Sequence, residues 1–208
     1  MLNIKKFNTG IYDVNTYVIW DNDTKDTAVI DWGGDFKLVN DFLNDNNLNL
    51  NFVLNTHGHF DHIMADDEVQ KKLGTPIYAH EKDKELIAYL PIQLEMFGIT
   101  DGIEAPQIDN WLEDGDTLKL GNYEIKVIYT PGHSQGGVCY LVENNLFSGD
   151  TLFYESIGRT DFPYGNHEQL INSIKTKLLP LDDGIKVFPG HGYETTIEHE
   201  RKYNTFIK

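Results

Sequence analysis

Hydrophobic positions in the first half of the chain change repeatedly between the period of a strand and the period of a helix. Strands are predicted where β-branched and aromatic residues run together, at residues 15–20, 28–31, 50–54 and 77–79. Helices are predicted where apolar residues recur at helical spacing, at residues 37–43, 63–73 and 81–90. Asp35 is placed to cap the first helix, and Pro91 is expected to end the third. Sites in open α/β sheets lie at the carboxyl ends of such strands.

Strand patterns dominate the second half of the chain. Alternating apolar residues predict a hairpin over 117–129, and further strands are expected at residues 138–142, 146–150 and 185–188. A helix is predicted over 168–179, with a capping-box pattern at Asn166 and Gln169. The closing helix has the same pattern at Thr195 and Glu198.

Residues 92–110, between the two halves, have weak periodicity. Long irregular connections often serve as lids or binding loops, so Met96 and Phe97 are candidate substrate-facing residues. Packing of the same two side chains on the core is an equal alternative. Repeats, low-complexity blocks and linkers are not evident, and residues 1–208 are therefore expected to form a single domain.

Composition and charge narrow the functional classes. A hydrophobic content of 40% is typical of a globular chain, and no apolar run approaches the ~20 residues of a membrane span. The first residues lack the apolar block of a signal peptide, and Cys139 has no partner for an internal disulfide, so a cytoplasmic location is expected. Cys139 lies in an apolar run and is expected to be a buried thiol. The net charge of −16 argues against nucleic acid as a partner and leaves a small molecule, with the oligomeric state open.

A dense group of potential metal ligands follows the strand at 50–54. His57, His59, Asp61 and His62 fall within six positions of a chain that has 8 histidines in 208 residues. Chance would produce this pattern in roughly one such sequence in a thousand. Imidazole and carboxylate groups suit zinc and related divalent ions. In an extended segment His57 and His59 point the same way, which leaves Asp61 and His62 to face a second metal about 3.5–4 Å from the first.

Three later residues have a similar setting. Each follows a strand-like run and has a glycine beside or close to it, and the three are His133, Asp150 and His191. Together with the first group they make seven ligands from four strand ends. Seven are too many for one tetrahedral zinc but suit two metals that share a carboxylate.

The order His-x-His-x-Asp-His, His, Asp, His resembles the metallo-β-lactamase superfamily over nearly the whole chain. The resemblance implies an α/β fold, the four-layer αβ/βα sandwich of that superfamily. It also implies that His57, His59 and His133 hold a first metal and that Asp61, His62 and His191 hold a second, with Asp150 bridging them. The cofactors would be two divalent ions, expected to be Zn²⁺, with Fe or Mn as alternatives.

Within that superfamily the chain resembles the short, single-domain members of the glyoxalase II (hydroxyacylglutathione hydrolase) group. True lactamases lack the bridging aspartate that Asp150 matches. Residues 149–153 and 190–193 resemble segments of the glyoxalase II group. Arg159 stands where that group has a glutathione-contacting lysine, and Tyr193 matches a glutathione-contacting tyrosine. Both are therefore candidate substrate-binding residues, with a structural ion pair between Arg159 and Asp161 as the alternative for the arginine.

The resemblance implies thioester hydrolysis, for example of an S-acyl-glutathione, by attack of a metal-bridging hydroxide that Asp61 orients. Ser134 and Asp31 are expected to accept hydrogen bonds from ligand imidazoles. An alternative enzyme is a persulfide dioxygenase, which residues 158–162 resemble and which would hold one iron at His57, His133 and Asp150. A non-catalytic metal-binding module is a third class. The acyl group, the thiol carrier and the native metal stay open.

Overall fold

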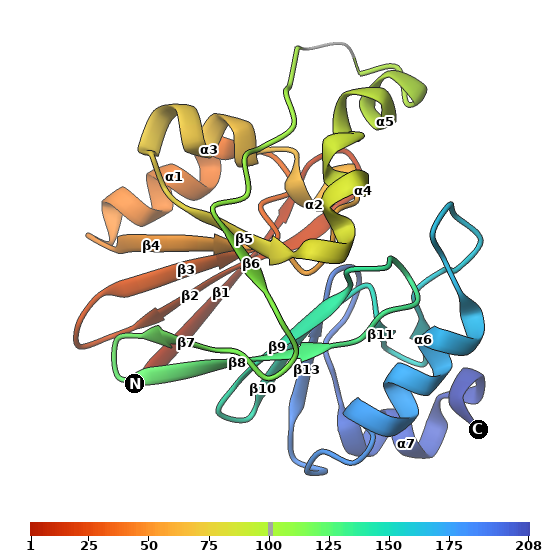
Figure 1. Ribbon diagram of the computed structural model, residues 1–208. Helices are drawn as coiled ribbons and strands as arrows, with labels where there is room; N and C mark the ends of the chain where they lie inside the picture. Colours follow the sequence, from red (N-terminus) through yellow and green to blue (C-terminus); the bar gives the residue numbers. More distant parts are fainter. Residues whose placement is uncertain (100–101) are drawn as a thin grey trace.

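Two six-stranded sheets form the centre of the molecule in the computed structural model, which describes residues 1–99 and 102–208 (Figure 1). The first sheet has the order β1 to β6, with bounds Leu2–Thr9, Val14–Asp21, Asp26–Ile30, Asn49–Leu54, Ile77–His80 and Asn110–Leu112. Strands β1 to β3 are antiparallel neighbours, whereas β3 to β6 run parallel. The parallel strands bring the loops after β3 and β4 to one edge of the sheet.

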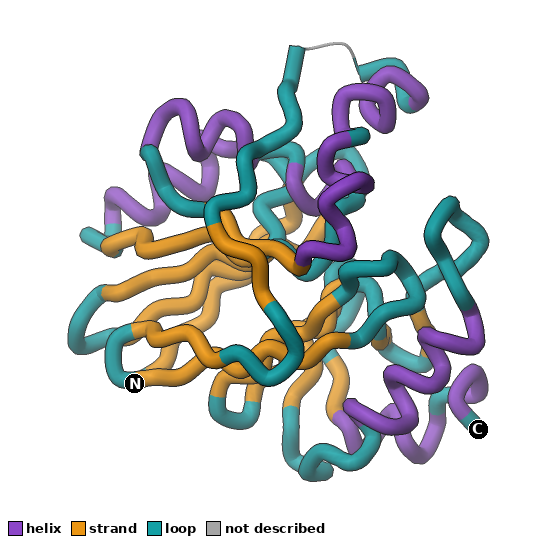
Figure 2. The backbone as a smooth tube through the Cα atoms, in the orientation of Figure 1, coloured by secondary structure: helices purple, strands orange, loops and turns teal. Residues whose placement is uncertain are grey.

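The second sheet has the order β14-β13-β10-β9-β8-β7. In that order the bounds of its strands are Thr195–Thr196, Lys186–Pro189, Asn145–Gly149, Val138–Val142, Tyr123–Tyr129 and Thr117–Leu120. Figure 2 draws the strands of both sheets in orange, with the purple helices outside them. Strands β10 and β13 run parallel, so their carboxyl ends lie side by side at one edge of the second sheet. A small two-stranded sheet, β11 (Leu152–Phe153) with β12 (Ser156–Ile157), follows β10.

Apolar packing places helices on the outer faces of both sheets. Residues from both sheets, such as Tyr17, Ile30 and Phe147, share one buried cluster between them. The outer face of the first sheet packs on α1 (Phe36–Asp45) and α3 (Asp66–Leu73), and α4 (Lys84–Ala88) and α5 (Leu90–Met96) cover the region near β5 (Figure 1). The outer face of the second sheet packs on α6 (His167–Ser173), the π-helical turn Ile174–Leu178 and α7 (Ile197–Tyr203). The expected four-layer αβ/βα sandwich is confirmed.

The predicted elements agree with the structure apart from their ends and interruptions. The helix expected over 63–73 is divided into α2 (Phe60–Ile63) and α3, because Ala65 donates its amide to the Trp32 carbonyl between them. Pro91 does not end a helix. It lies in the first turn of α5, where a missing N–H leaves no hydrogen bond unmade. The strand Leu2–Thr9 was not expected.

Two predicted helix caps are wrong in detail. Asp35 precedes α1 in a left-handed conformation, and its carboxylate accepts from the Gly10 amide at 2.9 Å instead of from the helix. The closing helix is capped by Thr196, whose Oγ1 accepts from the His199 amide at 3.1 Å. Thr195 instead donates to the buried Glu200 at 2.6 Å. Asn166 does cap α6, as expected.

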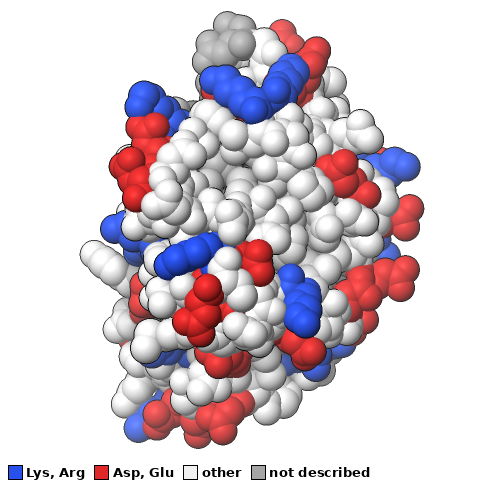
Figure 3. Space-filling view, turned by 90° about the vertical axis from the view of Figure 1, so that its left-hand side faces the viewer, with Lys and Arg blue, Asp and Glu red and all other residues white. Residues whose placement is uncertain are grey.

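The surface mixes charges of both signs. Figure 3 shows acidic and basic side chains interspersed on one face of the molecule. Helices α1 and α3 carry lysine–carboxylate pairs four residues apart, such as Lys71 with Asp67. Cys139 is a buried free thiol, as expected. Within residues 1–99 and 102–208, no helix combines the length and the apolar character that crossing a bilayer requires.

Asp66, the first residue of α3, is a buried acid whose replacement by asparagine should stabilise the protein. Its Oδ2 accepts from Asn55 Nδ2 at 2.6 Å, while its Oδ1 has no partner among the described residues. Burial raises the pKa of Asp66 well above its ordinary value. The raised pKa means that stability is lost as pH rises from the unfolded pKa, near 4, through the folded one.

Asp66→Asn removes this titration, since an amide pairs with Asn55 without ionising. We expect a gain in the free energy of unfolding of about 1–2 kcal/mol at pH 8 and a smaller one at pH 5. Urea unfolding of both proteins at the two pH values measures this difference. A gain that is the same at both pH values would contradict the assignment.

Candidate metal centre

Four loops at the ends of β4, β8, β10 and β13 carry the residues that the sequence singled out. His57 to His62 follow β4, and His133 follows β8. Asp150 comes directly after β10, and His191 lies two residues beyond β13. The chain therefore brings ligands from both sheets to the edge where these strands end.

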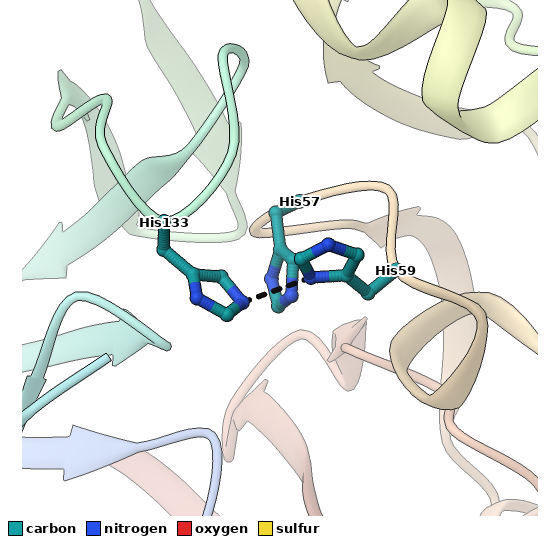
Figure 4. A group of neighbouring side chains, drawn as sticks. All are labelled: His57, His59 and His133. Carbon is teal, nitrogen blue, oxygen red and sulfur yellow. Dashed lines mark hydrogen bonds between the residues drawn. The ribbon is translucent and has the colours of Figure 1, made fainter. Parts of the chain in front are cut away.

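The first cluster consists of His57, His59 and His133, whose rings face one another in Figure 4. His59 Nδ1 lies 2.8 Å from His133 Nε2, the contact drawn as a dashed line. The centroid of the His57 ring is 4.8 Å from that of His59 and 4.7 Å from that of His133. One nitrogen from each ring lies within 4.8 Å of the others. This spacing allows the three nitrogens to bind one ion.

Hydrogen bonds outside the cluster fix which nitrogen each ring presents. His57 Nδ1 contacts Thr56 Oγ1 at 3.0 Å, and that hydroxyl donates to Asp31 Oδ2 at 2.7 Å. His133 Nδ1 contacts the Arg159 carbonyl at 2.7 Å. The outer nitrogen of each ring therefore carries the proton, and the Nε2 atoms of His57 and His133 are left as acceptors for a cation.

The second cluster consists of Asp61, His62 and His191. Asp61 Oδ2 lies 3.3 Å from His191 Nε2 and 3.7 Å from His62 Nε2. His62 Nδ1 contacts Asp31 Oδ2 at 2.9 Å, so its Nε2 faces the cluster. Asp31 thus accepts from a ligand imidazole, in the arrangement expected from the sequence.

Asp150 lies between the two clusters. Its Oδ1 is 3.5 Å from His62 Nε2, and its Oδ2 is 3.5 Å from His133 Nε2 and 3.8 Å from His191 Nε2. Glycine at position 190 permits this approach, because a Cβ there would lie 2.3 Å from Asp150 Oδ1. One carboxylate therefore contacts histidines of both clusters.

The two clusters differ in their electrostatics. Burial, with help from neighbouring imidazoles, lowers the pKa of His57 well below its ordinary value and that of His59 to about 3. Burial acts in the same direction on His62, but Asp150, Asp61 and Asp31 outweigh it and raise the pKa of His62 to about 10. Burial also acts to lower the pKa of His191, but the carboxylates of Asp61 and Asp150 together outweigh burial and raise that pKa above its ordinary value. His57 and His59 therefore favour the neutral form, whereas His62 and His191 favour the charged form.

The donor set fits divalent metal ions. Among the buried side-chain atoms that have no hydrogen-bond partner within the described residues, three belong to the candidate ligands, namely His57 Nε2, His62 Nε2 and Asp150 Oδ1. Buried polar atoms are normally paired, so three unpaired acceptor positions among neighbouring candidate ligands fit the binding of a cation. Imidazole nitrogens with carboxylate oxygens are ligands that zinc, iron and manganese accept.

The other candidate residues, Arg159, Tyr193, Phe97 and Met96, have exposed side chains. The Arg159 guanidinium makes two hydrogen bonds to Asp161, at 2.7 and 2.8 Å, and lies over the Phe162 ring. Tyr193 is 80% exposed. Phe97 stacks on Phe60, beside His59, with ring centroids 4.6 Å apart, whereas the Met96 side chain is 75% exposed.

Ser134 does not bond a ligand imidazole, contrary to expectation. Its hydroxyl donates to the buried carboxylate of Asp83 at 2.7 Å.

Two residues that support the candidate ligand loops, Thr56 and Asn15, were not predicted from the sequence. Asn15 donates its amide to the Gly190 carbonyl at 2.7 Å and its side chain to the Pro189 and Gly192 carbonyls. Thr56 adjoins the histidine motif, but Asp83 and Asn15 have no distinguishing pattern around them in the sequence.

Comparisons with known proteins agree with this geometry. The family model described as the metallo-beta-lactamase superfamily matches residues 9–191. Hydroxyacylglutathione hydrolase GloC of Haemophilus influenzae is 40% identical to this chain. The alignment covers 99% of this chain and 98% of GloC.

Two solved structures are similar over nearly their whole length. The B3 metallo-beta-lactamase BLEG-1 has a TM-score of 0.88 and 38% identity, with 100% of this chain and 99% of that chain covered. TTHA1623 in a di-iron-bound form has a TM-score of 0.87 and 30% identity, with coverage of 97% and 99%. The fold, the matched family model and the full-length relatives together establish that this chain belongs to the metallo-beta-lactamase superfamily.

Proposed function

We propose that the protein is a binuclear metal-dependent hydrolase that cleaves a thioester of the S-acyl-glutathione type. Superfamily membership makes it a relative of metal-dependent hydrolases. The observation that carries the binuclear proposal is the position of Asp150, in contact with His133 of the first cluster and with His62 and His191 of the second. His57, His59 and His133 would hold one ion, Asp61, His62 and His191 would hold the other, and Asp150 would bridge them.

Two bound divalent ions, proposed to be Zn²⁺ with Fe or Mn as alternatives, would lower the pKa of a water to about 7 and stabilise charge on a substrate carbonyl. Asp61 is proposed to orient the attacking water through its second oxygen, since Oδ2 faces His191. A thiolate leaves readily without a proton, so thioester cleavage requires little help from a general acid. Because the side chains of His57 and His62 are buried, the surrounding protein atoms keep both rings in fixed orientations.

Arg159 and Tyr193 are proposed to contact the substrate. Arginine recognises carboxylates through its planar, two-pronged guanidinium, and Arg159 already holds one carboxylate, that of Asp161. A glutathione-type carrier has free carboxylates that would compete for this group. The exposed Tyr193 hydroxyl is free to bond the same carrier from the side of His191.

Similarity to GloC supports a hydroxyacylglutathione thioester as the substrate. Similarity to BLEG-1 supports a second candidate activity, the opening of a β-lactam ring.

The dioxygenase alternative needs one iron at His57, His133 and Asp150, and it leaves His59 and the second cluster without a function. The position of His59 Nδ1, 2.8 Å from His133 Nε2, supports a ligand role for His59, which the dioxygenase arrangement does not require.

The test combines metal analysis with a substrate panel. Metal-free protein is loaded with Zn²⁺, Fe²⁺ or Mn²⁺, and metal content is measured alongside thioester hydrolysis, β-lactam hydrolysis and oxygen uptake with a glutathione persulfide. We expect two ions per chain and hydrolysis of S-acyl-glutathione without oxygen uptake. One iron per chain with oxygen uptake would replace the proposal by a dioxygenase, and β-lactam opening without thioester cleavage would replace it by a lactamase.

A further inference from the structure

We propose that Asp83 is a positioning residue that holds the loop 57–59 against the loop 133–136, so that the three histidines of the first cluster meet at one ion. This inference rests on the proposed function, because it assumes that the first cluster binds a metal. Asp83 ends the 3₁₀ turn Glu81–Asp83 before α4 and is 1% exposed.

The Asp83 carboxylate bonds to both loops. Its Oδ2 accepts from the Gly58 amide at 2.9 Å and from Ser134 Oγ at 2.7 Å, and its Oδ1 accepts from the Gly136 amide at 2.5 Å. Gly58 lies between His57 and His59, whereas Ser134 and Gly136 follow His133 closely. A single side chain therefore joins a loop of the first sheet to a loop of the second.

Two glycines make room for this carboxylate. A Cβ at Gly136 would lie 2.6 Å from Asp83 Cγ. A Cβ at Gly58 would lie 2.8 Å from Ile87 Cγ1 and 3.3 Å from Asp83 Cβ. A side chain at Gly136 would therefore collide with Asp83, and one at Gly58 would collide with Ile87 and crowd Asp83. Because both loop backbones pass close to the Asp83 side chain, a displacement of the carboxylate would move both loops.

The effect of Asp83 should be confined to the first cluster. The second cluster is held by a different carboxylate, since Asp31 contacts His62 Nδ1. Asp83→Asn keeps the shape of the side chain but replaces one acceptor oxygen by an NH₂ group, which would face another donor. The loops must then separate or leave a buried donor unpaired, and either outcome disturbs the His57–His59–His133 geometry.

The experiment measures each metal site in isolation. His191→Ala removes a ligand of the second cluster, and His133→Ala removes a ligand of the first. Asp83→Asn is added to each background, and Zn²⁺ affinity is measured by competition with a chromophoric chelator. We expect Asp83→Asn to weaken binding about 10- to 100-fold in the His191→Ala background and less than about 3-fold in the His133→Ala background.

Asp21→Asn is the matched control. Asp21 is also solvent-inaccessible, and its carboxylate also accepts three hydrogen bonds, from the Asp23 amide and from the amide and side chain of Asn122. It ends β2 at the far end of the strand from Asn15. We expect Asp21→Asn to change either affinity less than about 3-fold. Ser134→Ala removes one of the three donors to Asp83 and should weaken Zn²⁺ binding at the first site by a smaller factor than Asp83→Asn does. It replaces Asp83→Asn in the experiment if that variant does not fold.

Several results would overturn the inference. Unchanged affinity at the first site would exclude a positioning effect of Asp83. Equal losses at both sites, matched by Asp21→Asn, would show that Asp83 acts only on general stability. Failure of the unmodified protein to bind two ions would instead overturn the proposed function, and the inference with it.

Discussion

Replacing Asp150 by alanine is expected to lower kcat/KM for thioester hydrolysis on the order of 10³-fold or more and to reduce the metal content from two ions to at most one. The carboxylate contacts His133 on one side and His62 and His191 on the other, so its removal affects both clusters at once. The two ions would then face each other without a shared negative charge, and their mutual repulsion would favour loss of one. Elemental analysis and steady-state kinetics on the same preparation measure both effects.

Asp161→Ala is the control for the loss of a nearby carboxylate. Asp161 is exposed and pairs with Arg159, and we expect this variant to retain two ions per chain. Retention of two ions and more than a tenth of the activity by Asp150→Ala would contradict the bridging role.

Asp31→Ala is expected to lower the free energy of unfolding of the metal-free protein by about 4 kcal/mol. The buried Asp31 carboxylate accepts from the Thr56 amide at 2.7 Å, from Thr56 Oγ1 at 2.7 Å and from His62 Nδ1 at 2.9 Å. Alanine leaves these three donors unpaired in the interior, at a cost of about 1–3 kcal/mol each, less whatever relaxation recovers. Urea unfolding in the presence of a chelator measures the loss apart from any effect of metal.

Asp35→Ala provides a close control for the backbone. Asp31 and Asp35 both have a positive φ, 53° and 49°, so alanine brings a similar conformational cost at each position. Within the described residues the Asp35 carboxylate accepts a single hydrogen bond, an exposed one from the Gly10 amide, and we expect a loss of less than about 1 kcal/mol. Equal losses in the two variants would attribute the effect at Asp31 to backbone strain.

Local pattern predicts most strands of the two sheets and selects the candidate ligands. The run at residues 138–142 is apolar on both faces and is bounded by turn residues, and the structure places β9 at those positions. The candidate ligands stand out because histidine is rare and because the first group and each of the three later residues follow a strand. The helix between residues 63 and 73 was predicted as continuous, since its interruption depends on the Trp32 carbonyl, which is distant in sequence.

Local sequence pattern does not predict the residues that support the site through long-range hydrogen bonds. Asp83 resembles any acidic residue at the start of a polar helix, and only the fold brings Gly58 and Gly136 to it. Ser134 was assigned to an imidazole because it adjoins His133, yet its hydroxyl points to Asp83. Neighbours in sequence were thus a poor guide to hydrogen-bond partners once the chain had folded.

Four of the seven proposed ligands lie before residue 63 and three lie after residue 132, on loops of opposite sheets. Neither half of the chain can therefore assemble a complete cluster of three together with Asp150. Under the proposed function, ions held between the halves would act as non-covalent cross-links, and their binding energy would add to that of sheet packing. The supply of metal would then govern how long the folded chain resists proteolysis, as well as whether it is active.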